Sequence, residues 1–184
     1  GGQYQEQDGT HASVSCKPCG PGEYAPGSST VCTDCETGKF QELASATEYS
    51  CKFCGAGTEF VNKSSACSAC TGGQYQEQNT FASAACKTCG KGQYAADDST
   101  ACASCQDGKF QELTSAADYT CKFCAAGTEF QTKTTACAAC TGGQYQEQTG
   151  VASVSCKTCG KGEYAADGST ECASCQDGKF QELT

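Results

Sequence analysis

The sequence predicts a small disulfide-rich repeat protein, an extended rod of short β-hairpin-like loops with little helix and no large hydrophobic core. Three observations support this fold class. Twenty of the 184 residues are cysteine, above the roughly 8–10% that marks disulfide scaffolds in short secreted chains. Leu, Val and Phe supply only 16 residues and Ile none, far below the roughly 20% at which a packed core becomes doubtful. The cysteines also repeat at a fixed spacing, which indicates a stack of equal units.

The cysteines occur only as Cys-x-x-Cys pairs, ten in all. The first members of successive pairs lie 16 and 19 residues apart in strict alternation, so the period is 35 residues. A longer period of 70 residues also exists, because residues 71–105 match residues 141–175 at 27 of 35 positions. We call this 70-residue unit the super-repeat. The last copy stops where earlier copies continue, so we expect a longer array. The predicted repeat units are A1 at 1–35, B1 at 36–70, A2 at 71–105, B2 at 106–140, A3 at 141–175 and the start of B3 at 176–184.

Each pair is followed by a glycine and then by an aromatic residue. The glycine stands three residues after the second cysteine in all ten copies, as in Gly22, Gly38 and Gly73. Such a fixed glycine is typical of a turn with positive φ, a conformation that a Cβ atom disfavours. The aromatic residue, as in Tyr24 and Phe40, is predicted to begin a short strand and to pack over a disulfide. The Gly, Ser, Thr, Asp and Ala residues that follow predict a surface loop.

The Cys-x-x-Cys pairs fit two chemistries. Two pairs supply the four thiolates of a zinc site, and the turn at 16–19 resembles a zinc knuckle. A disulfide ladder in a secreted protein is the favoured interpretation. The pairs never form isolated four-cysteine blocks, the glycine and aromatic follow every pair, and residues 62–64 are a glycosylation sequon. We therefore expect no metal, no cofactor, and a glycan on Asn62.

The half-unit Cys-x-x-Gly-x-Tyr/Phe…Cys-x-x-Cys resembles the cysteine-rich repeats of tumour-necrosis-factor receptors and is similar to the ephrin-receptor-like repeats of large extracellular proteins. Segments 19–32 and 35–51 carry the resemblance, which covers the whole chain. In the simple loop module of those receptors, the cysteine before Gly-x-Tyr bonds to the next cysteine. The resemblance therefore implies nine disulfides: Cys19–Cys32, Cys35–Cys51, Cys54–Cys67, Cys70–Cys86, Cys89–Cys102, Cys105–Cys121, Cys124–Cys137, Cys140–Cys156 and Cys159–Cys172.

On the same pairing rule, Cys16 and Cys175 would bond to residues beyond the ends of this sequence. The alternative is an interlocked arrangement, in which Cys16 bonds to Cys32 and Cys19 bonds to Cys35. Spacing alone does not decide between the two arrangements.

The composition argues against several classes of function. The chain has 12 Lys, no Arg and 21 acidic residues, a net charge of −9, so we expect no nucleic-acid partner. No stretch approaches the roughly 20 apolar residues of a membrane helix, so we expect no membrane contact within this sequence. Catalysis needs a unique constellation of groups, whereas every reactive residue type except the lone His11 recurs in the repeats. We therefore expect no enzyme activity.

The predicted function is that of an extracellular structural protein, a disulfide-laddered array that forms a stalk, fibre or filament on or outside a cell. Its expected partners are identical repeats and attached glycans. The near-identity of the copies favours this interpretation, because a ligand-binding repeat usually carries local differences. The alternatives are a cell-surface receptor or adhesin ectodomain with a protein or glycan ligand, and a four-cysteine zinc-repeat protein.

Overall fold

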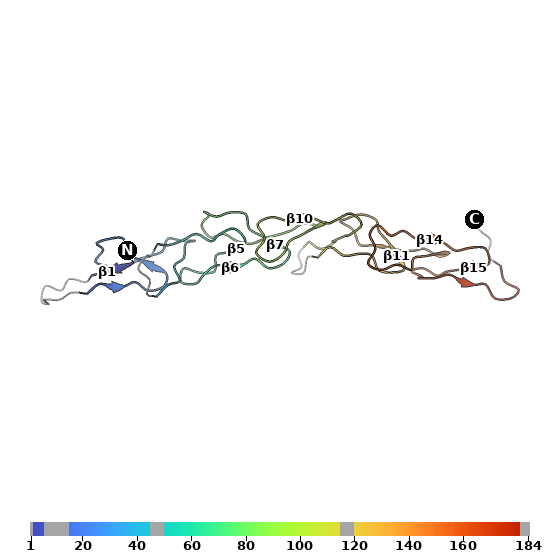
Figure 1. Cartoon of the computed structure of the whole chain (residues 1–184), viewed down its shortest axis with the longest axis horizontal. Helices are drawn as coiled ribbons and strands as arrows, with labels where there is room; N and C mark the ends of the chain where they lie inside the picture. The colour runs from blue at the N-terminus through green and yellow to red at the C-terminus, as the bar shows by residue number, and fades with distance from the viewer. Residues whose placement is uncertain (1, 6–14, 45–49, 115–119, 181–184) are drawn as a thin grey trace. The chain divides into compact units, whose positions relative to one another are not determined.

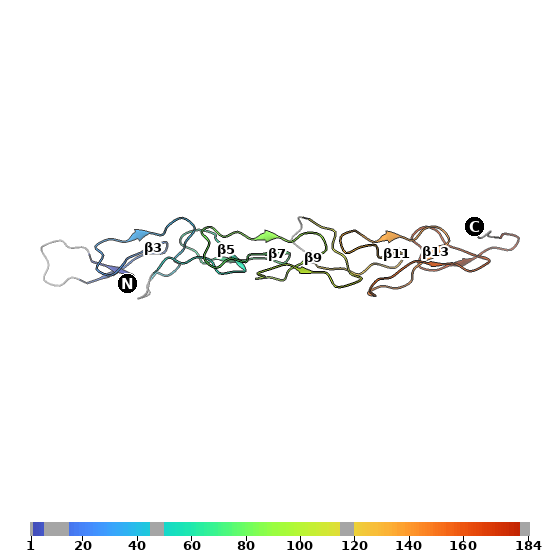
Figure 2. The same ribbon diagram turned by 90° about the horizontal axis from the view of Figure 1, so that it is seen from above.

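The structure is a computed structural model that describes residues 2–5, 15–44, 50–114 and 120–180. Within these ranges it contains no helix, and hence none of the length and apolarity needed to cross a membrane. Regular structure is limited to two-residue strands joined by turns and loops (Figures 1 and 2). The fold is therefore a small disulfide-rich repeat fold with hairpins, as the sequence predicts. The strands are β1 (Gln3–Tyr4), β2 (Lys17–Pro18), β3 (Glu23–Tyr24), β4 (Thr33–Asp34), β5 (Thr58–Glu59), β6 (Ser68–Ala69), β7 (Gln74–Tyr75), β8 (Lys87–Thr88), β9 (Gln93–Tyr94), β10 (Ala103–Ser104), β11 (Thr128–Glu129), β12 (Ala138–Ala139), β13 (Gln144–Tyr145), β14 (Lys157–Thr158), β15 (Glu163–Tyr164) and β16 (Ala173–Ser174).

Each hairpin pairs the two residues after a turn glycine with the two middle residues of a Cys-x-x-Cys pair. In the hairpin of β3 and β4, Glu23 lies opposite Asp34 and Tyr24 opposite Thr33. The same antiparallel pattern joins β1 to β2, β5 to β6, β9 to β10, β11 to β12, β13 to β14 and β15 to β16. The prediction that the aromatic residue begins the strand is wrong, because the strand begins directly after the glycine. Residues three apart along a strand face opposite sides, so the two cysteines of a pair close different loops.

The structure contains nine disulfides, each between the second cysteine of one pair and the first cysteine of the next. They have Cα–Cα distances of 5.6–5.8 Å, in the usual range. The short loops, with a separation of 13 residues, are Cys19–Cys32, Cys54–Cys67, Cys89–Cys102, Cys124–Cys137 and Cys159–Cys172. The long loops, with a separation of 16 residues, are Cys35–Cys51, Cys70–Cys86, Cys105–Cys121 and Cys140–Cys156.

These nine pairs are the ones that the receptor resemblance implies, and they differ from the interlocked alternative. A disulfide-bonded cysteine has no thiolate to give to a metal, so a zinc site is not available to these eighteen residues. Cys16 and Cys175 are free thiols, the first exposed and the second half-buried. Their pairing with cysteines beyond this sequence stays a prediction.

The buried interior consists mainly of cysteine sulfur and glutamine amides, with a few aromatic and small aliphatic side chains. The nine disulfide-bonded second cysteines of the pairs are at most 4% exposed. One small cluster consists of Phe40, Cys54 and Ala84, with Phe60 and Cys67 packed against it. Its counterpart one super-repeat later consists of Phe110, Cys124 and Val154, with Phe130 and Cys137 packed against it. In both clusters aromatic rings pack with disulfide-bonded cysteines, as the sequence predicts.

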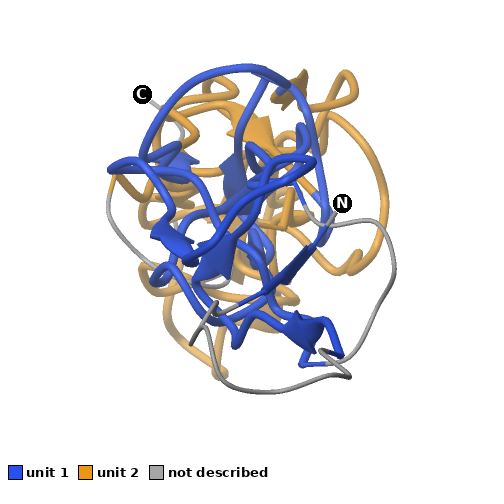
Figure 3. Cartoon of the chain, turned by 90° about the vertical axis from the view of Figure 1, so that its left-hand side faces the viewer, with its two compact units in different colours: residues 1–87, 96–101 blue, residues 88–95, 102–184 orange. Residues whose placement is uncertain are grey.

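The chain divides into two compact units, shown in different colours in Figure 3. Compact unit 1 comprises residues 1–87 and 96–101, and compact unit 2 comprises residues 88–95 and 102–184. Internal contacts of the first unit recur in the second at positions displaced by one super-repeat. For example, Phe60 N donates a hydrogen bond to Ala84 O at 2.7 Å, and Phe130 N donates one to Val154 O at 2.9 Å.

Candidate functional site: the loop-docking surface

Turn glycines are the first part of the surface through which one loop contacts the next. All ten have φ between +74° and +84°, which confirms the turn conformation predicted from the sequence. In two of the long loops the glycine also permits a close approach. A Cβ atom on Gly38 would lie 2.2 Å from Ser83 N, and one on Gly108 would lie 2.2 Å from Ser153 N. Ser83 and Ser153 belong to the next long loop, so glycine is needed here for both conformation and space.

Buried glutamines are the second part of this surface. They follow the aromatic residue of every long loop, are 1–2% exposed, and occupy the same place in each: Gln41, Gln76, Gln111 and Gln146. Gln111 Nε2 donates to Gly90 O at 3.3 Å and to Gln93 O at 3.2 Å, both in the turn of the preceding short loop. Gln111 Oε1 accepts a bond from Leu113 N. The first two glutamines make the same set of bonds, whereas the side-chain amide of the fourth makes no hydrogen bond.

Backbone hydrogen bonds complete the surface. Gly22 N donates to Gln41 O at 2.7 Å, and Gln41 N donates to Lys63 O at 2.9 Å. Both bonds recur one super-repeat later, in compact unit 2. Each of these two long loops is therefore held between the short loop before it and the short loop after it. We call this set of turn glycines, glutamines and backbone groups the loop-docking surface.

The sequence reasoning missed the glutamines. Glutamine is mostly exposed in proteins, and its bonding partners here are carbonyl groups of a different loop. The sequence feature that could have identified them is their fixed position, because a glutamine follows the aromatic residue in all four long loops. The equivalent position in the short loops varies, with Ala25, Val61, Ala95, Gln131 and Ala165.

Replacing Gln111 by leucine should destabilise the fold by about 1–3 kcal/mol, because the carbonyl group of Gln93 and the amide of Leu113 lose their side-chain partner in a partly buried place. Gly90 O keeps its bond from Gln93 N. The matched control is Gln131→Leu. Gln131 also follows an aromatic residue, but its side chain is exposed and bonds to Glu129 on the surface. The measurement is thermal unfolding of the oxidised proteins by calorimetry. Equal losses in the two variants would contradict the role assigned to the buried amide.

Exposed ion pairs recur between a glutamate of a long loop and the lysine directly after the disulfide that closes it. Lys87 Nζ donates to Glu77 Oε1, and Lys157 Nζ donates to Glu147 Oε1. Each ammonium group also lies 5.8 Å from the centroid of a tyrosine ring. The hydrogen bond from Lys87 lowers the pKa of Glu77, and its counterpart lowers the pKa of Glu147. Because these folded-state pKa values are depressed, the stability from each pair is present above the ordinary pKa of glutamate and is lost as the pH falls through the depressed value.

Replacing Lys87 by methionine should raise the pKa of Glu77 towards the ordinary glutamate value, because the charged donor is removed. Glu147 keeps its lysine in this variant, so its depressed pKa should not change. Titration of the side-chain carboxyl signals by NMR measures both groups in one sample. Because the pairs are exposed, we expect little change in overall stability. An unchanged pKa of Glu77 would show that the ion pair does not persist in solution.

Asn62, the predicted glycosylation site, lies on an exposed turn of a short loop. Ser64 N donates to Asn62 Oδ1 at 2.9 Å, and Ser64 Oγ donates to the same oxygen at 3.1 Å. Both bonds use Oδ1 and leave Nδ2, the atom that receives an N-linked glycan, outside this turn. The only histidine of the sequence, His11, lies outside the described residues. In the described ranges no group of three or more His, Cys, Asp or Glu residues is arranged to hold a metal ion.

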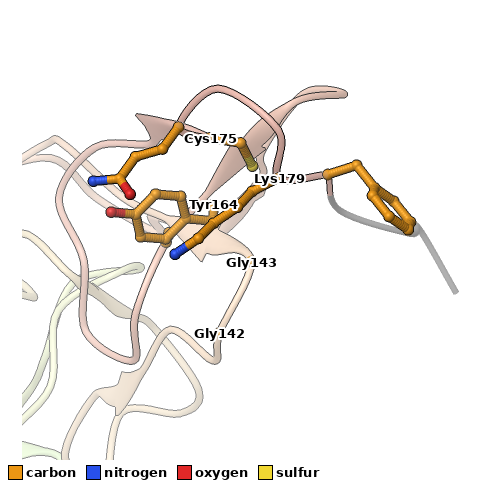
Figure 4. Close-up of a pocket in the computed structure, with 8 residues that line it drawn as sticks. Gly142, Gly143, Tyr164, Cys175 and Lys179 are labelled. Carbon is orange, nitrogen blue, oxygen red and sulfur yellow. The ribbon is translucent and has the colours of Figure 1, made fainter.

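A small pocket recurs in both compact units. In unit 2 it has a volume of about 230 Å³ and is lined by Tyr94, Gln106, Lys109, Thr120 and Cys121. In unit 1 it has a volume of about 200 Å³ and is lined by the equivalent residues of the preceding super-repeat, which are Tyr24, Glu36, Lys39, Ser50 and Cys51. The next set in sequence lines a wider pocket of about 570 Å³: Tyr164, Gln176 and Lys179, with Gly142, Gly143, Ala165, Cys175 and Phe180 (Figure 4). We call these three sites the recurrent pockets.

Comparison with protein-family models and with curated proteins finds no match to this chain. The chain is a cysteine-rich repeat protein on the evidence of its own disulfide-bonded units and hairpins. Its many disulfides fit an extracellular protein, because such bonds persist in oxidising compartments.

Proposed function

We propose that the chain is part of an extracellular structural protein whose cysteine-rich repeats build a stalk, fibre or filament. The recurrence of the loop-docking surface is the observation that supports this proposal. Ser83 N donates to Gly38 O at 3.3 Å, and Ser153 N donates to Gly108 O at 3.4 Å, so the same contact serves successive repeats. A stack in which every unit offers the same surface has no intrinsic end point, and such arrays need atypical caps to terminate.

The partners under this proposal are further copies of the same repeat, in one long chain or in several chains side by side. The role does not involve catalysis, because the reactive side chains recur from unit to unit as parts of the repeated surface. The finer relationship, to the loop modules of tumour-necrosis-factor receptors and ephrin-receptor-like repeats, is supported by the shared half-unit and by the pairing of the cysteines.

Small-angle X-ray scattering of the oxidised chain tests the structural role. We expect a rise of roughly 20–30 Å per repeat unit, because each loop doubles back at its disulfide and an extended chain spans at most about 3.3 Å per residue. The expected particle is a rod roughly 100 Å long or more, with a radius of gyration well above the roughly 16 Å of a compact domain of this length. A compact, near-spherical scattering profile would reject the stalk or filament.

Glycosylation of Asn62 belongs to the same proposal, since an N-linked glycan requires passage through the secretory pathway. Secretion from a eukaryotic host should give a protein that carries a glycan on Asn62. A peptide N-glycosidase should remove this glycan, and the variant Asn62→Gln should lack it. Thr132 occupies the position of Asn62 in the equivalent turn of compact unit 2. We therefore expect a glycan on the turn of compact unit 1 and none on the equivalent turn of compact unit 2. A secreted protein with an unmodified Asn62 would reject this part.

A receptor or adhesin ectodomain is the second candidate function, and the recurrent pockets favour it. They are concave and combine a tyrosine with polar groups, and the first two keep a tyrosine, a lysine, a hydroxyl-bearing residue and a cysteine at equivalent positions. The two roles differ in what the full reading frame must encode. A membrane span followed by a cytosolic domain would support the ectodomain, whereas many further repeats after a signal peptide would support the structural array.

A further inference from the structure

The recurrent pockets share one arrangement of a tight turn and a tyrosine. One wall of each pocket is a tight turn after the second cysteine of a pair. In these turns Lys39 N donates to Glu36 O at 3.1 Å, Lys109 N donates to Gln106 O at 3.1 Å, and the third copy has the same bond at 3.0 Å. The turn therefore presents a carboxyl or amide side chain and a lysine in the same relative positions each time. The facing wall is the tyrosine of the preceding short loop.

The tyrosine is accessible to a ligand. Tyr94 is 36% exposed, unlike Phe40 and Phe110, which pack into the buried clusters. Figure 4 shows Tyr164 and Lys179 as two of the side chains that line the third pocket. An exposed aromatic ring provides an apolar face and, in tyrosine, a hydroxyl group for hydrogen bonding.

The polar groups around the ring can both donate and accept hydrogen bonds. Gln106 offers an amide and Thr120 a hydroxyl group in unit 2. Lys109 Nζ lies 4.6 Å from the centroid of the Phe123 ring, and Lys39 Nζ lies 4.8 Å from that of Phe53. Each ammonium group is therefore positioned by a ring rather than left to move freely in solvent.

The size of the pocket limits the ligand to a single ring. The first two recurrent pockets, of about 200 and 230 Å³, are below the roughly 300–1,000 Å³ of sites for drug-sized molecules. The third, of about 570 Å³, is wider because no residues equivalent to Thr120 and Cys121 line it. A ligand that matches one aromatic wall and several mixed donors and acceptors must itself have an apolar face and a rim of hydroxyl groups. A pyranose ring has this combination, with C–H groups on its faces and hydroxyl groups at its edge.

The charge of the site selects a neutral ring. A cationic ligand would meet the lysine of each pocket. An anionic ligand would approach a chain of net charge −9. In unit 1 Lys39 is also bonded to Glu36 at 2.7 Å, whereas in unit 2 Gln106 takes the place of that glutamate and the net charge of the chain alone disfavours an anion. We propose that each recurrent pocket binds one neutral pyranose residue of a glycan, so that every super-repeat makes one such contact with a polysaccharide. This site goes beyond the structural role and is compatible with either candidate function.

Binding of neutral oligosaccharides to the oxidised chain tests the proposal. The probes are cello-, laminari- and manno-hexaose, with hexagalacturonate as the anionic comparison, and NMR chemical shifts give the site and the affinity. We expect at least one neutral hexaose to bind and to shift the signals of the pocket residues. The variant Tyr24→Ala/Tyr94→Ala/Tyr164→Ala should bind it about tenfold more weakly, the loss expected for one aromatic contact.

The matched control is Tyr75→Ala/Tyr145→Ala, which removes tyrosines that stack with Lys87 and Lys157 outside the pockets. This variant should keep the native affinity. If the triple tyrosine variant fails to form its nine disulfides, the variant with the three pocket lysines changed to methionine replaces it and should bind about three- to tenfold more weakly. The site is rejected if no neutral hexaose binds, if only the galacturonate binds, or if the control weakens binding as much as the pocket variant. None of these results bears on the rod shape that scattering measures.

Discussion

Replacing Gly108 by alanine is expected to destabilise compact unit 2 by more than about 4 kcal/mol, a value at the extreme of single substitutions. The glycine has a φ of +77°, which costs other residues about 1–2 kcal/mol. The added Cβ atom would also lie 2.2 Å from Ser153 N and 2.7 Å from Ala152 C. These are backbone atoms of the next long loop, so the clash cannot be relieved by a change of rotamer. The loops must separate, and the bond from Ser153 N to Gly108 O must break.

Gly162→Ala is the matched control for this prediction. Gly162 has a φ of +78°, and no heavy atom lies within 4 Å of the position of its missing Cβ. This variant should be destabilised by only about 1–2 kcal/mol, the cost of placing a residue with a Cβ atom at positive φ. Calorimetric unfolding of the unsubstituted chain and the two variants, all oxidised, measures the loss of stability that each substitution causes. Mass spectrometry maps their disulfides. Equal destabilisation by the two substitutions would contradict the close approach of successive long loops.

The features that were predictable from the sequence are those set by local chemistry. The turn glycines were identified from their fixed position after each cysteine pair, because positive φ is a property of a single residue. The lack of a large core followed from the scarcity of Leu, Val and Phe. The family of hairpins also followed, although each strand begins one residue earlier than expected in loops such as that of Tyr24. In each case the cause lies within a few residues of the effect.

The features that were not predictable depend on partners in other loops. The burial of Gln111 requires the carbonyl groups of Gly90 and Gln93, which lie in the preceding short loop, and no property of glutamine alone indicates them. The turn at 16–19 resembles a zinc knuckle, yet its two middle residues form β2 because they pair with the residues after Gly2. The recurrent pockets also combine three separate segments. The regular spacing of the glutamines and of the pocket residues was the one feature of the sequence that indicated these roles.

Reducing all nine disulfides is expected to unfold the whole chain at room temperature. Each disulfide closes a loop with a separation of 13 or 16 residues, which contributes about 3 kcal/mol in the chain-entropy description. Nine such loops sum to roughly 27 kcal/mol, more than the roughly 5–15 kcal/mol that separates most folded proteins from their unfolded chains. The apolar clusters around Phe40 and Phe110 contain only a few side chains each, so they cannot replace this contribution.

Reduction followed by alkylation should therefore give NMR spectra with the narrow shift range of an unfolded chain. Alkylation without reduction, which modifies only the free thiols of Cys16 and Cys175, should leave the spectrum native. The local counterpart is Cys105→Ser/Cys121→Ser, which opens one long loop and should lower stability by about 3 kcal/mol. It should also free the amide of Gln111, which belongs to that loop, so hydrogen exchange at Leu113 N should quicken more than exchange at the equivalent Leu43 N in compact unit 1. A reduced chain that kept dispersed signals would show that the loop-docking surface holds the repeats together without the covalent ladder.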